Sequence, residues 1–287
     1  MSSESHVLSN QAQVIAESLE KLINDAAIEV PMLPEVANKA LLLAQNPDSD
    51  ATEMAKLIQS DQSLAGHVMR IANSVAYTPL ANLVSLQQAI ARLGMGLISE
   101  IALAASIGTK LFNTPGYEDY VGQLWRHALA SGLWAKEIAR HSRTNVEVAF
   151  LAGLLHSMGR PAVLQSILDL AKQQSVTLSP ADIKTLESNY YHSVTTSVIN
   201  AWKMPSLVVE AVSYYADYKQ APNALTQAAQ VHAGALYATY MLNEDELDKA
   251  ALLSSPVLSI LNLYQDEAEQ LLTHTEAVKG RLEGLSS

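Results

Sequence analysis

Apolar residues recur every three or four positions along almost the whole chain, which is the spacing that gathers side chains on one face of an α-helix. This spacing predicts helices over residues 14–23, over residues 36–44 after Pro34, and over residues 118–141. No segment shows the alternation of β-branched and polar residues that indicates a half-buried strand. The pattern therefore predicts an all-α protein, with many helices in a compact arrangement.

Residues typical of helix N-caps predict further helices. Asp50 with Glu53, and Ser85 with Gln88, have the spacing of capping boxes, in which two side chains satisfy free backbone N–H groups at a helix start. Asp61 has the position of an N-cap. The remaining predicted helices cover residues 62–72, 86–93, about 95–112, 161–174, 179 onward, 194–202, 205 onward, 224–242 and 245–253, with a tail helix after Ser255-Pro256.

One strong helix breaker divides the chain. Residues 113–116 read Asn-Thr-Pro-Gly. This segment is too short to act as a flexible linker, so we expect a boundary near residues 113–117 between two closely packed helical lobes. We predict an N-terminal helical extension over residues 1–24, a domain over residues 25–220, and a C-terminal helical part over residues 221–287 that packs on the domain or extends it.

Composition and charge narrow the possible functions. Of the 287 residues, 18 are Lys or Arg and 29 are Asp or Glu, which gives a formal charge of −11 and argues against binding to nucleic acid or to anionic membranes. The chain has no cysteine, which excludes disulfides, thiolate zinc sites and cysteine-bound iron–sulfur clusters. The N-terminus has neither a basic leader nor an apolar core, so we expect a cytoplasmic protein. The oligomeric state stays open.

Residues 150–160 carry the most distinctive chemistry. An apolar helix runs into His156 and Ser157, and Gly159 is expected to release the backbone before a new helix begins at Pro161. The stretch resembles the apolar-Gly-Leu-Leu-His-Asp-x-Gly motif of the HD superfamily of metal-dependent phosphohydrolases, whose His-Asp pair holds metal. Here Ser157 replaces the aspartate, and a neutral hydroxyl cannot bridge cations as a carboxylate does.

Several motifs in order along the chain, over about residues 25–220, resemble the HDOD domain family. They lie at residues 33–37, 57–64, 69–74 and 89–94 in the first half and at residues 124–127, 153–156 and 202–205 in the second. The resemblance implies a compact helical module of bacterial signalling proteins, related to the HD phosphohydrolases but generally without their full ligand set. The family-motif positions are Pro34, Asp61, Asn73, Ser74, Gly94, Trp125, Gly153, Ser157, Trp202 and Pro205.

The histidines allow two interpretations. His127 and His156 match the first two histidines of an HD site, but Tyr214-Tyr215 stands where two-metal relatives place a histidine pair, and no Asp or Glu occurs at residues 218–243. The two imidazoles could hold a transition metal if other donors converged, with His192 and His232 as candidates. Alternatively, each could form hydrogen bonds inside the helical core, which is commoner for a histidine on an apolar face, and we favour this interpretation.

Other polar positions allow the same two interpretations. Asp61 and Asn73-Ser74 could form a binding surface, but we favour an N-cap at Asp61 and a helix end at Asn73 in a left-handed conformation. Three tyrosines and three arginines could contact a nucleotide, the tyrosines by stacking on the base and the arginines by binding phosphate. Core packing of the tyrosines and helix-face ion pairs of the arginines are the simpler interpretation. These residues are Tyr214, Tyr215, Tyr218, Arg70, Arg92 and Arg126.

The missing carboxylates decide the functional hypothesis. We predict a non-catalytic signalling module that binds a regulatory protein or a small signalling ligand and needs no cofactor. The alternative is a divergent metal-dependent phosphohydrolase in which His127 and His156 hold an iron, manganese or zinc ion.

Overall fold

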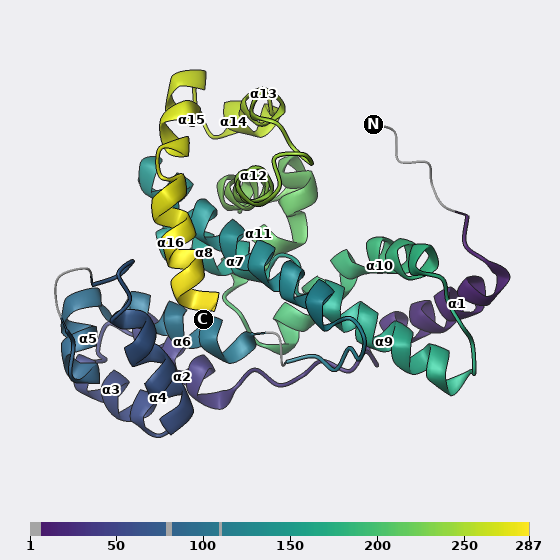
Figure 1. The fold of residues 1–287 in the computed structure, drawn as a ribbon, viewed down its shortest axis with the longest axis horizontal. Helices are drawn as coiled ribbons and strands as arrows, with labels where there is room; N and C mark the ends of the chain where they lie inside the picture. The colour runs from purple at the N-terminus through teal and green to yellow at the C-terminus, as the bar shows by residue number, and fades with distance from the viewer. Residues whose placement is uncertain (1–6, 79–81, 109–110, 287) are drawn as a thin grey trace.

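The computed structural model describes residues 7–78, 82–108 and 111–286, and none of them lies in a β-strand, which confirms the all-α prediction (Figure 1). Along the chain the helices are α1 (Asn10–Asn24), α2 (Glu35–Gln45), α3 (Ala51–Gln59), α4 (Gln62–Ala72), α5 (Leu86–Leu93), α6 (Met95–Ile107), α7 (Glu118–His141), α8 (Val146–Leu155), α9 (Gly159–Gln173), α10 (Pro180–Ala201), α11 (Ser206–Tyr214), the 3₁₀ helix η1 (Tyr215–Gln220), α12 (Leu225–Leu242), α13 (Lys249–Leu253), α14 (Pro256–Ile260), α15 (Gln265–Leu272) and α16 (Thr275–Ser286).

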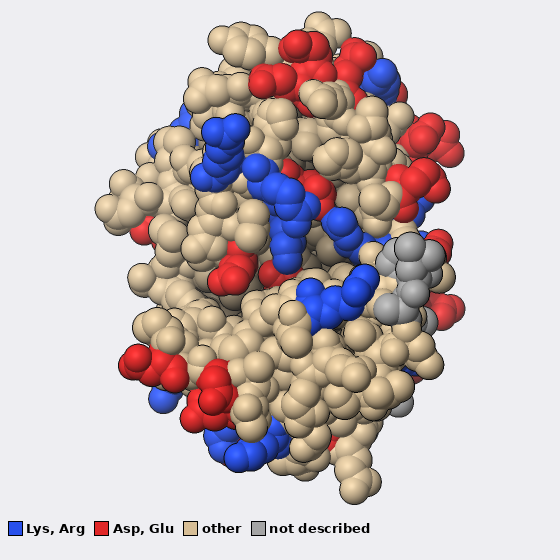
Figure 2. All heavy atoms as spheres, turned by 90° about the vertical axis from the view of Figure 1, so that its left-hand side faces the viewer, with Lys and Arg blue, Asp and Glu red and all other residues tan. Residues whose placement is uncertain are grey.

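Helices α2–α6 pack on one another and form an N-terminal lobe, whereas α7–α12 form a C-terminal lobe. The tail helix α16 runs back from α15 to contact both α7 and α6 (Figure 1). The face on the left of Figure 1 is hollowed at the junction between the lobes, and Lys and Arg side chains gather around the hollow (Figure 2). Among the described residues no single helix is long and apolar enough to cross a membrane; α5 and α6 reach that length only together, across a bend of 117°.

The local signals define most helix starts. Asp50 accepts hydrogen bonds from two backbone N–H groups of α3 and completes a capping box with Glu53. Ser179 accepts one such bond, from Asp182 N, and completes a capping box with Asp182 at the start of α10. Asp61 accepts a hydrogen bond from Leu64 N at 3.0 Å, which confirms it as an N-cap. The long helix predicted over residues 118–141 is found with the same bounds.

Several predicted helix bounds are wrong. Helix α6 ends at Ile107 and not near residue 112, because Gly108 takes a φ of 33°. The two helices predicted over residues 179–202 are one, α10. Helix α13 begins at Lys249, after its N-cap Asp248, and not at residue 245. The predicted tail helix is three helices, α14 to α16, separated at residues 261–264 and 273–274.

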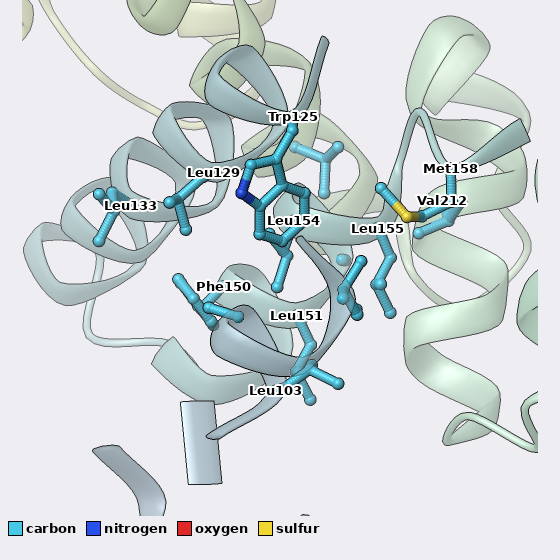
Figure 3. Close-up of a cluster of buried hydrophobic side chains, with 14 of the residues drawn as sticks. Leu103, Trp125, Leu129, Leu133, Phe150, Leu151, Leu154, Leu155, Met158 and Val212 are labelled. Atoms are coloured by element: carbon cyan, nitrogen blue, oxygen red, sulfur yellow. The ribbon is translucent and has the colours of Figure 1, made fainter. Parts of the chain in front are cut away.

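Three glycines allow the backbones of α7, α8 and α12 to touch. A Cβ atom on Gly153 would lie 2.7 Å from Gly132 Cα, and one on Gly234 would lie 2.7 Å from Ser131 O. Leucine and aromatic side chains of α7 and α8 surround these crossings, and Leu103 of α6 reaches the same cluster from the N-terminal lobe (Figure 3). The close crossings bring residue 127 of α7 next to the end of α8.

The N-terminal helix packs on the C-terminal lobe, against α9 and α10. Ser9 Oγ donates to Asp182 Oδ2 at 3.1 Å, and Tyr190 OH donates to Glu20 at 2.7 Å. The chain then crosses to the N-terminal lobe, and Trp202 Nε1 donates to Pro31 O at 2.8 Å along this crossing. The first helix is therefore held by residues more than 150 positions away.

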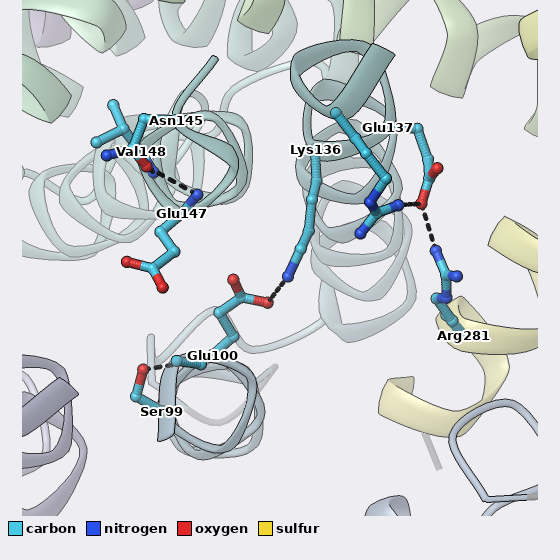
Figure 4. Close-up of polar contacts among 10 residues, drawn as sticks. Ser99, Glu100, Lys136, Glu137, Asn145, Glu147, Val148 and Arg281 are labelled. Atoms are coloured by element: carbon cyan, nitrogen blue, oxygen red, sulfur yellow. Dashed lines mark hydrogen bonds and ion pairs between the residues drawn. The ribbon is translucent and has the colours of Figure 1, made fainter. Parts of the chain in front are cut away.

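A buried carboxylate holds the C-terminal helix in place. Glu137 on α7 is 4% exposed and accepts hydrogen bonds from Arg140 and, at 2.5 Å, from Arg281 of α16, while His274 Nδ1 lies 3.2 Å from its other oxygen (Figure 4). Burial alone would raise the pKa of Glu137, but the hydrogen bonds from Arg140 and Arg281 hold this pKa below its ordinary value. The carboxylate is therefore charged at neutral pH.

We expect Glu137→Gln to destabilise the protein by about 2–3 kcal/mol, less than the loss of a fully buried pair because both arginines reach solvent. The free energy of unfolding in urea measures this loss. Glu276→Gln, which removes a carboxylate that is 86% exposed and paired with Lys279 on the same helix, is the matched control and should leave the unfolding midpoint unchanged. Equal midpoints for Glu137→Gln and wild type would contradict the anchoring role.

Candidate functional site

A cleft of about 670 Å³ in the C-terminal lobe is lined by His127, His156 and Ser157. We call it the histidine cleft; its floor is formed by His127, His156 and Ser157, with Arg160 and Tyr215 beside them. His127 comes from α7, while His156 and Ser157 form the short turn between α8 and α9. The glycine crossings of α7 and α8 thus bring the two imidazole rings to a centroid distance of 6.1 Å.

His156 is buried and neutral. Its side chain is surrounded so closely that burial, with smaller effects from His127 and Arg160, lowers the pKa of His156 to about 3. Nδ1 lies 2.6 Å from Gly153 O, and because a carbonyl can only accept, Nδ1 must carry the proton. The lone pair of Nε2 therefore stays available, and the edge of the Tyr215 ring packs against the imidazole at a centroid distance of 4.9 Å.

His127 uses its outer nitrogen within the protein. Nε2 lies 3.0 Å from Thr239 Oγ1, and the Thr239 hydroxyl already donates its own hydrogen to Ala235 O at 3.0 Å. His127 Nε2 must therefore be the donor to Thr239. Burial lowers the pKa of His127, so this ring too is neutral at physiological pH.

A network of one arginine, one carboxylate and three tyrosines continues the wall of the cleft. Arg160 Nη1 donates to Glu187 Oε1 at 2.6 Å, and Tyr120 OH donates to Glu187 Oε2 at 2.6 Å. The guanidinium of Arg160 lies 4.1 Å from the centre of the Tyr191 ring, whose hydroxyl is 2.9 Å from Tyr215 OH. Sequence reasoning missed this network, because its members come from four elements and no local spacing connects them.

Gly159 was expected to lie in the turn before a helix that begins at Pro161, but it is itself the first residue of α9. Its N–H donates to Thr195 Oγ1 at 2.9 Å. A Cβ atom at this position would lie 2.0 Å from Tyr191 O and 2.5 Å from Thr195 N. Gly159 therefore allows α9 to touch α10, which brings Arg160 to Glu187.

The two additional candidate donors do not line the histidine cleft. His192 Nε2 donates to Ser213 O at 2.7 Å, and its buried Nδ1 has no partner among the described residues. His232 Nδ1 donates to Tyr215 O at 3.0 Å, and its ring packs against Tyr218. His232 thus holds the start of η1, which carries Tyr215, and His192 holds the end of α11 just before it.

Asn73 ends α4 but does so differently from the prediction. Its φ is −87° and not left-handed. Instead its side-chain amide bridges two segments: Nδ2 donates to Leu83 O at 2.9 Å, and Oδ1 accepts from Leu83 N at 2.7 Å. The neighbouring Ser74 Oγ is buried without a partner among the described residues. Asp61 and Asn73 thus act within the N-terminal lobe, away from the histidine cleft.

The remaining family-motif positions have structural roles. Gly94 takes a φ of 83° at the sharp turn between α5 and α6, and Pro34 and Pro205 stand directly before α2 and α11. Trp125 is buried against α8 (Figure 3). Of the tyrosines and arginines considered for nucleotide contacts, only Tyr215 and Arg126 line the histidine cleft.

The donors in this cleft do not fit a hydrolytic metal ion. His156 Nε2 is available, but His127 Nε2 is engaged as a donor to Thr239, and Ser157 supplies only a neutral hydroxyl. Glu187 is bound to Arg160 and Tyr120. Over residues 7–78, 82–108 and 111–286, no three His, Cys, Asp or Glu side chains are grouped so that they could hold a metal ion. A hard, water-activating cation needs more carboxylate and imidazole donors than these.

Comparison with known proteins identifies the family. The sequence model of the HDOD domain matches residues 30–218, about two thirds of the chain. The chain belongs to the HDOD domain family. A curated relative, a Treponema pallidum protein of uncharacterised function, is 21% identical over 222 residues and covers 74% of this HDOD chain. The chain spans only 42% of the length of that relative.

Solved structures share the HDOD fold. An HDOD domain protein of unknown function from Geobacter sulfurreducens superposes with a TM-score of 0.71 at 20% identity and covers 95% of this chain and 97% of its own. A Shewanella amazonensis protein, named as a candidate metal-dependent phosphohydrolase, gives 0.70 at 20% identity, with 96% and 100% covered. A candidate signal transduction protein from Marinobacter aquaeolei gives 0.68 at 22% identity, with 99% and 68% covered. At these identities the likeness shows the fold alone.

Proposed function

We propose that this HDOD chain is a non-catalytic signalling module of the cytoplasm, and that its histidine cleft binds a small anionic ligand without converting it. The observation that carries the proposal is the hydrogen bonding of the two imidazoles. His127 Nε2 and His156 Nδ1 both donate to groups of the protein itself. Supporting the signalling role, one structural neighbour is named as a candidate signal transduction protein.

The charge around the cleft favours an anion. Arg126, Arg160 and Lys184 line it, with Glu246 at the same wall. Glu187 neutralises Arg160, so Arg126 and Lys184 together exceed Glu246 by one positive charge. The neutral imidazoles add polar groups but no charge. A cleft of this volume, with a few convergent polar groups over a partly apolar wall, has the properties of a small-molecule site.

Pyrophosphate is the probe for this proposal. We expect it to raise the melting temperature of the wild-type chain, by the stabilisation that any ligand of the folded state gives. The double variant Arg126→Gln/Lys184→Gln should lose this rise. Lys56→Gln, which removes an exposed cation of the N-terminal lobe, is the control and should keep it. No rise in the wild type, or an equal rise in the double variant, would refute an anion site in this cleft.

A divergent phosphohydrolase is the alternative function, supported by the free Nε2 of His156 and by the name of the Shewanella amazonensis neighbour. Metal analysis of protein purified without chelator separates the two proposals. Stoichiometric iron, manganese or zinc that disappears in His156→Ala, together with hydrolysis of a phosphoester, would replace the binding module by an enzyme. We expect neither metal nor turnover.

A further inference from the structure

A second cavity, of about 230 Å³, lies where the two lobes and the C-terminal helix meet. We call it the lobe-interface cavity. Leu97 and Glu100 of α6, Lys136 and Arg140 of α7, and Arg281 of α16 contribute to its walls. It shares no lining residue with the histidine cleft. Each of the three structural units of the fold therefore supplies a polar side chain to the same small space.

The inner end of the cavity holds a buried ion pair with one free oxygen. Glu100 is 4% exposed, and its Oε2 accepts from Lys136 Nζ at 2.5 Å (Figure 4). The other oxygen, Oε1, is buried and has no hydrogen-bond partner among the described residues. A buried carboxylate oxygen without a partner is costly, and a ligand with an N–H donor would relieve the cost. The inner end thus presents an acceptor beside the donor Lys136.

The outer end of the cavity is cationic. Arg140 is 50% exposed and Arg281 is 29% exposed, and both donate to the same carboxylate, Glu137. Each guanidinium has five N–H donors, so most of them remain free for an anion. Figure 2 shows Lys and Arg side chains around the hollow on this face. Glu147 of α8 is exposed and faces Glu100 at the inner end (Figure 4). Its negative charge therefore lies away from the two arginines at the outer end.

The space between the two ends is apolar. Leu93, Leu97, Ile101, Leu133 and Phe150 line it. The cavity is smaller than the roughly 300–1,000 Å³ typical of drug-sized ligands, so it accommodates one flat ring system and leaves any attached group at the outer end.

We propose that the lobe-interface cavity binds a purine mononucleotide, with the base against the Glu100–Lys136 pair and the phosphate at Arg140 and Arg281. A guanine base carries two N–H donors for the Glu100 carboxylate next to a carbonyl oxygen that accepts from Lys136. An adenine base offers only one such donor. Arginine binds phosphate through paired N–H groups, which suits the outer end. A nucleotide placed in this way would touch α6, α7 and α16 at once.

The test is calorimetric titration of the full chain with guanosine monophosphate, adenosine monophosphate and inorganic phosphate. Guanosine monophosphate should bind one to one, about tenfold or more tighter than adenosine monophosphate, since a hydrogen bond to a charged group is lost with adenine. Inorganic phosphate should bind more weakly still. Glu100→Gln, which places an amide donor where the base needs an acceptor, should weaken guanosine monophosphate by about tenfold or more.

Two further variants keep the test decisive. Leu97→Trp fills the cavity and retains all its charges, so it should abolish nucleotide binding even where Glu100→Gln fails to fold. Glu276→Gln on the exposed side of α16 should bind as the wild type does. Guanosine monophosphate that binds no tighter than phosphate, or that binds Leu97→Trp as well as wild type, would overturn the proposal. Neither result decides the pyrophosphate test, whose readout is the loss caused by Arg126→Gln/Lys184→Gln in the histidine cleft.

Discussion

Replacing Gly159 by alanine is expected to destabilise the protein by about 3 kcal/mol or more, at or above the upper end of overpacking effects. The added Cβ atom would meet two backbone atoms of α10, with Tyr191 O at 2.0 Å and Thr195 N at 2.5 Å. Backbone cannot rotate away as a flexible side chain can, so α9 and α10 must separate. Urea unfolding followed by circular dichroism measures the loss.

Gly122→Ala is the matched control for this substitution. Gly122 is also helical, on α7, but a Cβ atom there would have no neighbour within 4 Å. Alanine at an open helical position is expected to raise the free energy of unfolding by about 0.5–1 kcal/mol, because glycine loses more conformational freedom on folding. Equal unfolding midpoints for Gly159→Ala and wild type would show that the α9–α10 contact is not tight in solution.

The sequence predicted those parts of the fold that depend on nearby residues. A capping box or an N-cap involves side chains only three positions apart, so Asp50, Ser179 and Asp61 could be identified without tertiary information. The bounds of α7 follow from the same kind of evidence, because an apolar face that runs along 24 residues begins after the Asn-Thr-Pro-Gly breaker and ends before the polar residues 142–145. The HD-type motif paired His127 with His156, and in the structure their imidazole rings lie at a centroid distance of 6.1 Å.

The division of α10 into two helices failed for a physical reason. Residues 187–193 are mostly polar, so the apolar spacing on which the prediction depended is absent there. In the structure Glu187 is 1% exposed and paired with Arg160, and Tyr191 covers the same guanidinium. The buried face of α10 is thus polar in its middle, because it faces the histidine cleft. Hydrophobic periodicity cannot detect a helix face that is buried by charge pairing.

The contacts that define both cavities also lie beyond sequence reasoning. Arg160 meets Glu187 over 27 positions, Lys136 meets Glu100 over 36, and Arg281 meets Glu137 over 144. Each of these residues, viewed alone, resembles an ordinary helix-face charge. Only the crossings of the helices decide that they are buried together.

The second large effect is expected in the pH dependence of stability. Burial lowers the pKa of His156 from 6.5 to about 3. Between these two pH values the unfolded chain binds a proton at this histidine and the folded chain does not. The stability is therefore complete above about pH 6.5 and falls as the pH decreases toward 3. Between about pH 7.5 and about pH 5, this one histidine should remove about 2 kcal/mol from the free energy of unfolding, since one pKa unit corresponds to about 1.4 kcal/mol.

His156→Asn tests this expectation, because its amide nitrogen can still donate to Gly153 O while the side chain does not titrate. The variant will be less stable overall, owing to the space left by the ring, so the decisive quantity is the slope of stability against pH. That slope should be flatter than in wild type by about one proton between about pH 5 and pH 6. The slope that remains in His156→Asn includes a contribution from His127, because burial also lowers the pKa of His127.

His67→Asn provides the comparison, because it removes an exposed histidine of α4 by the same substitution and leaves His156 untouched. A wild-type slope that His156→Asn does not change would mean that the folded chain accepts the proton, as a solvated imidazole does. The ring would then be charged near pH 6, and a cationic imidazole cannot bind a metal. A flatter slope shows instead that a neutral His156 forms part of the folded core.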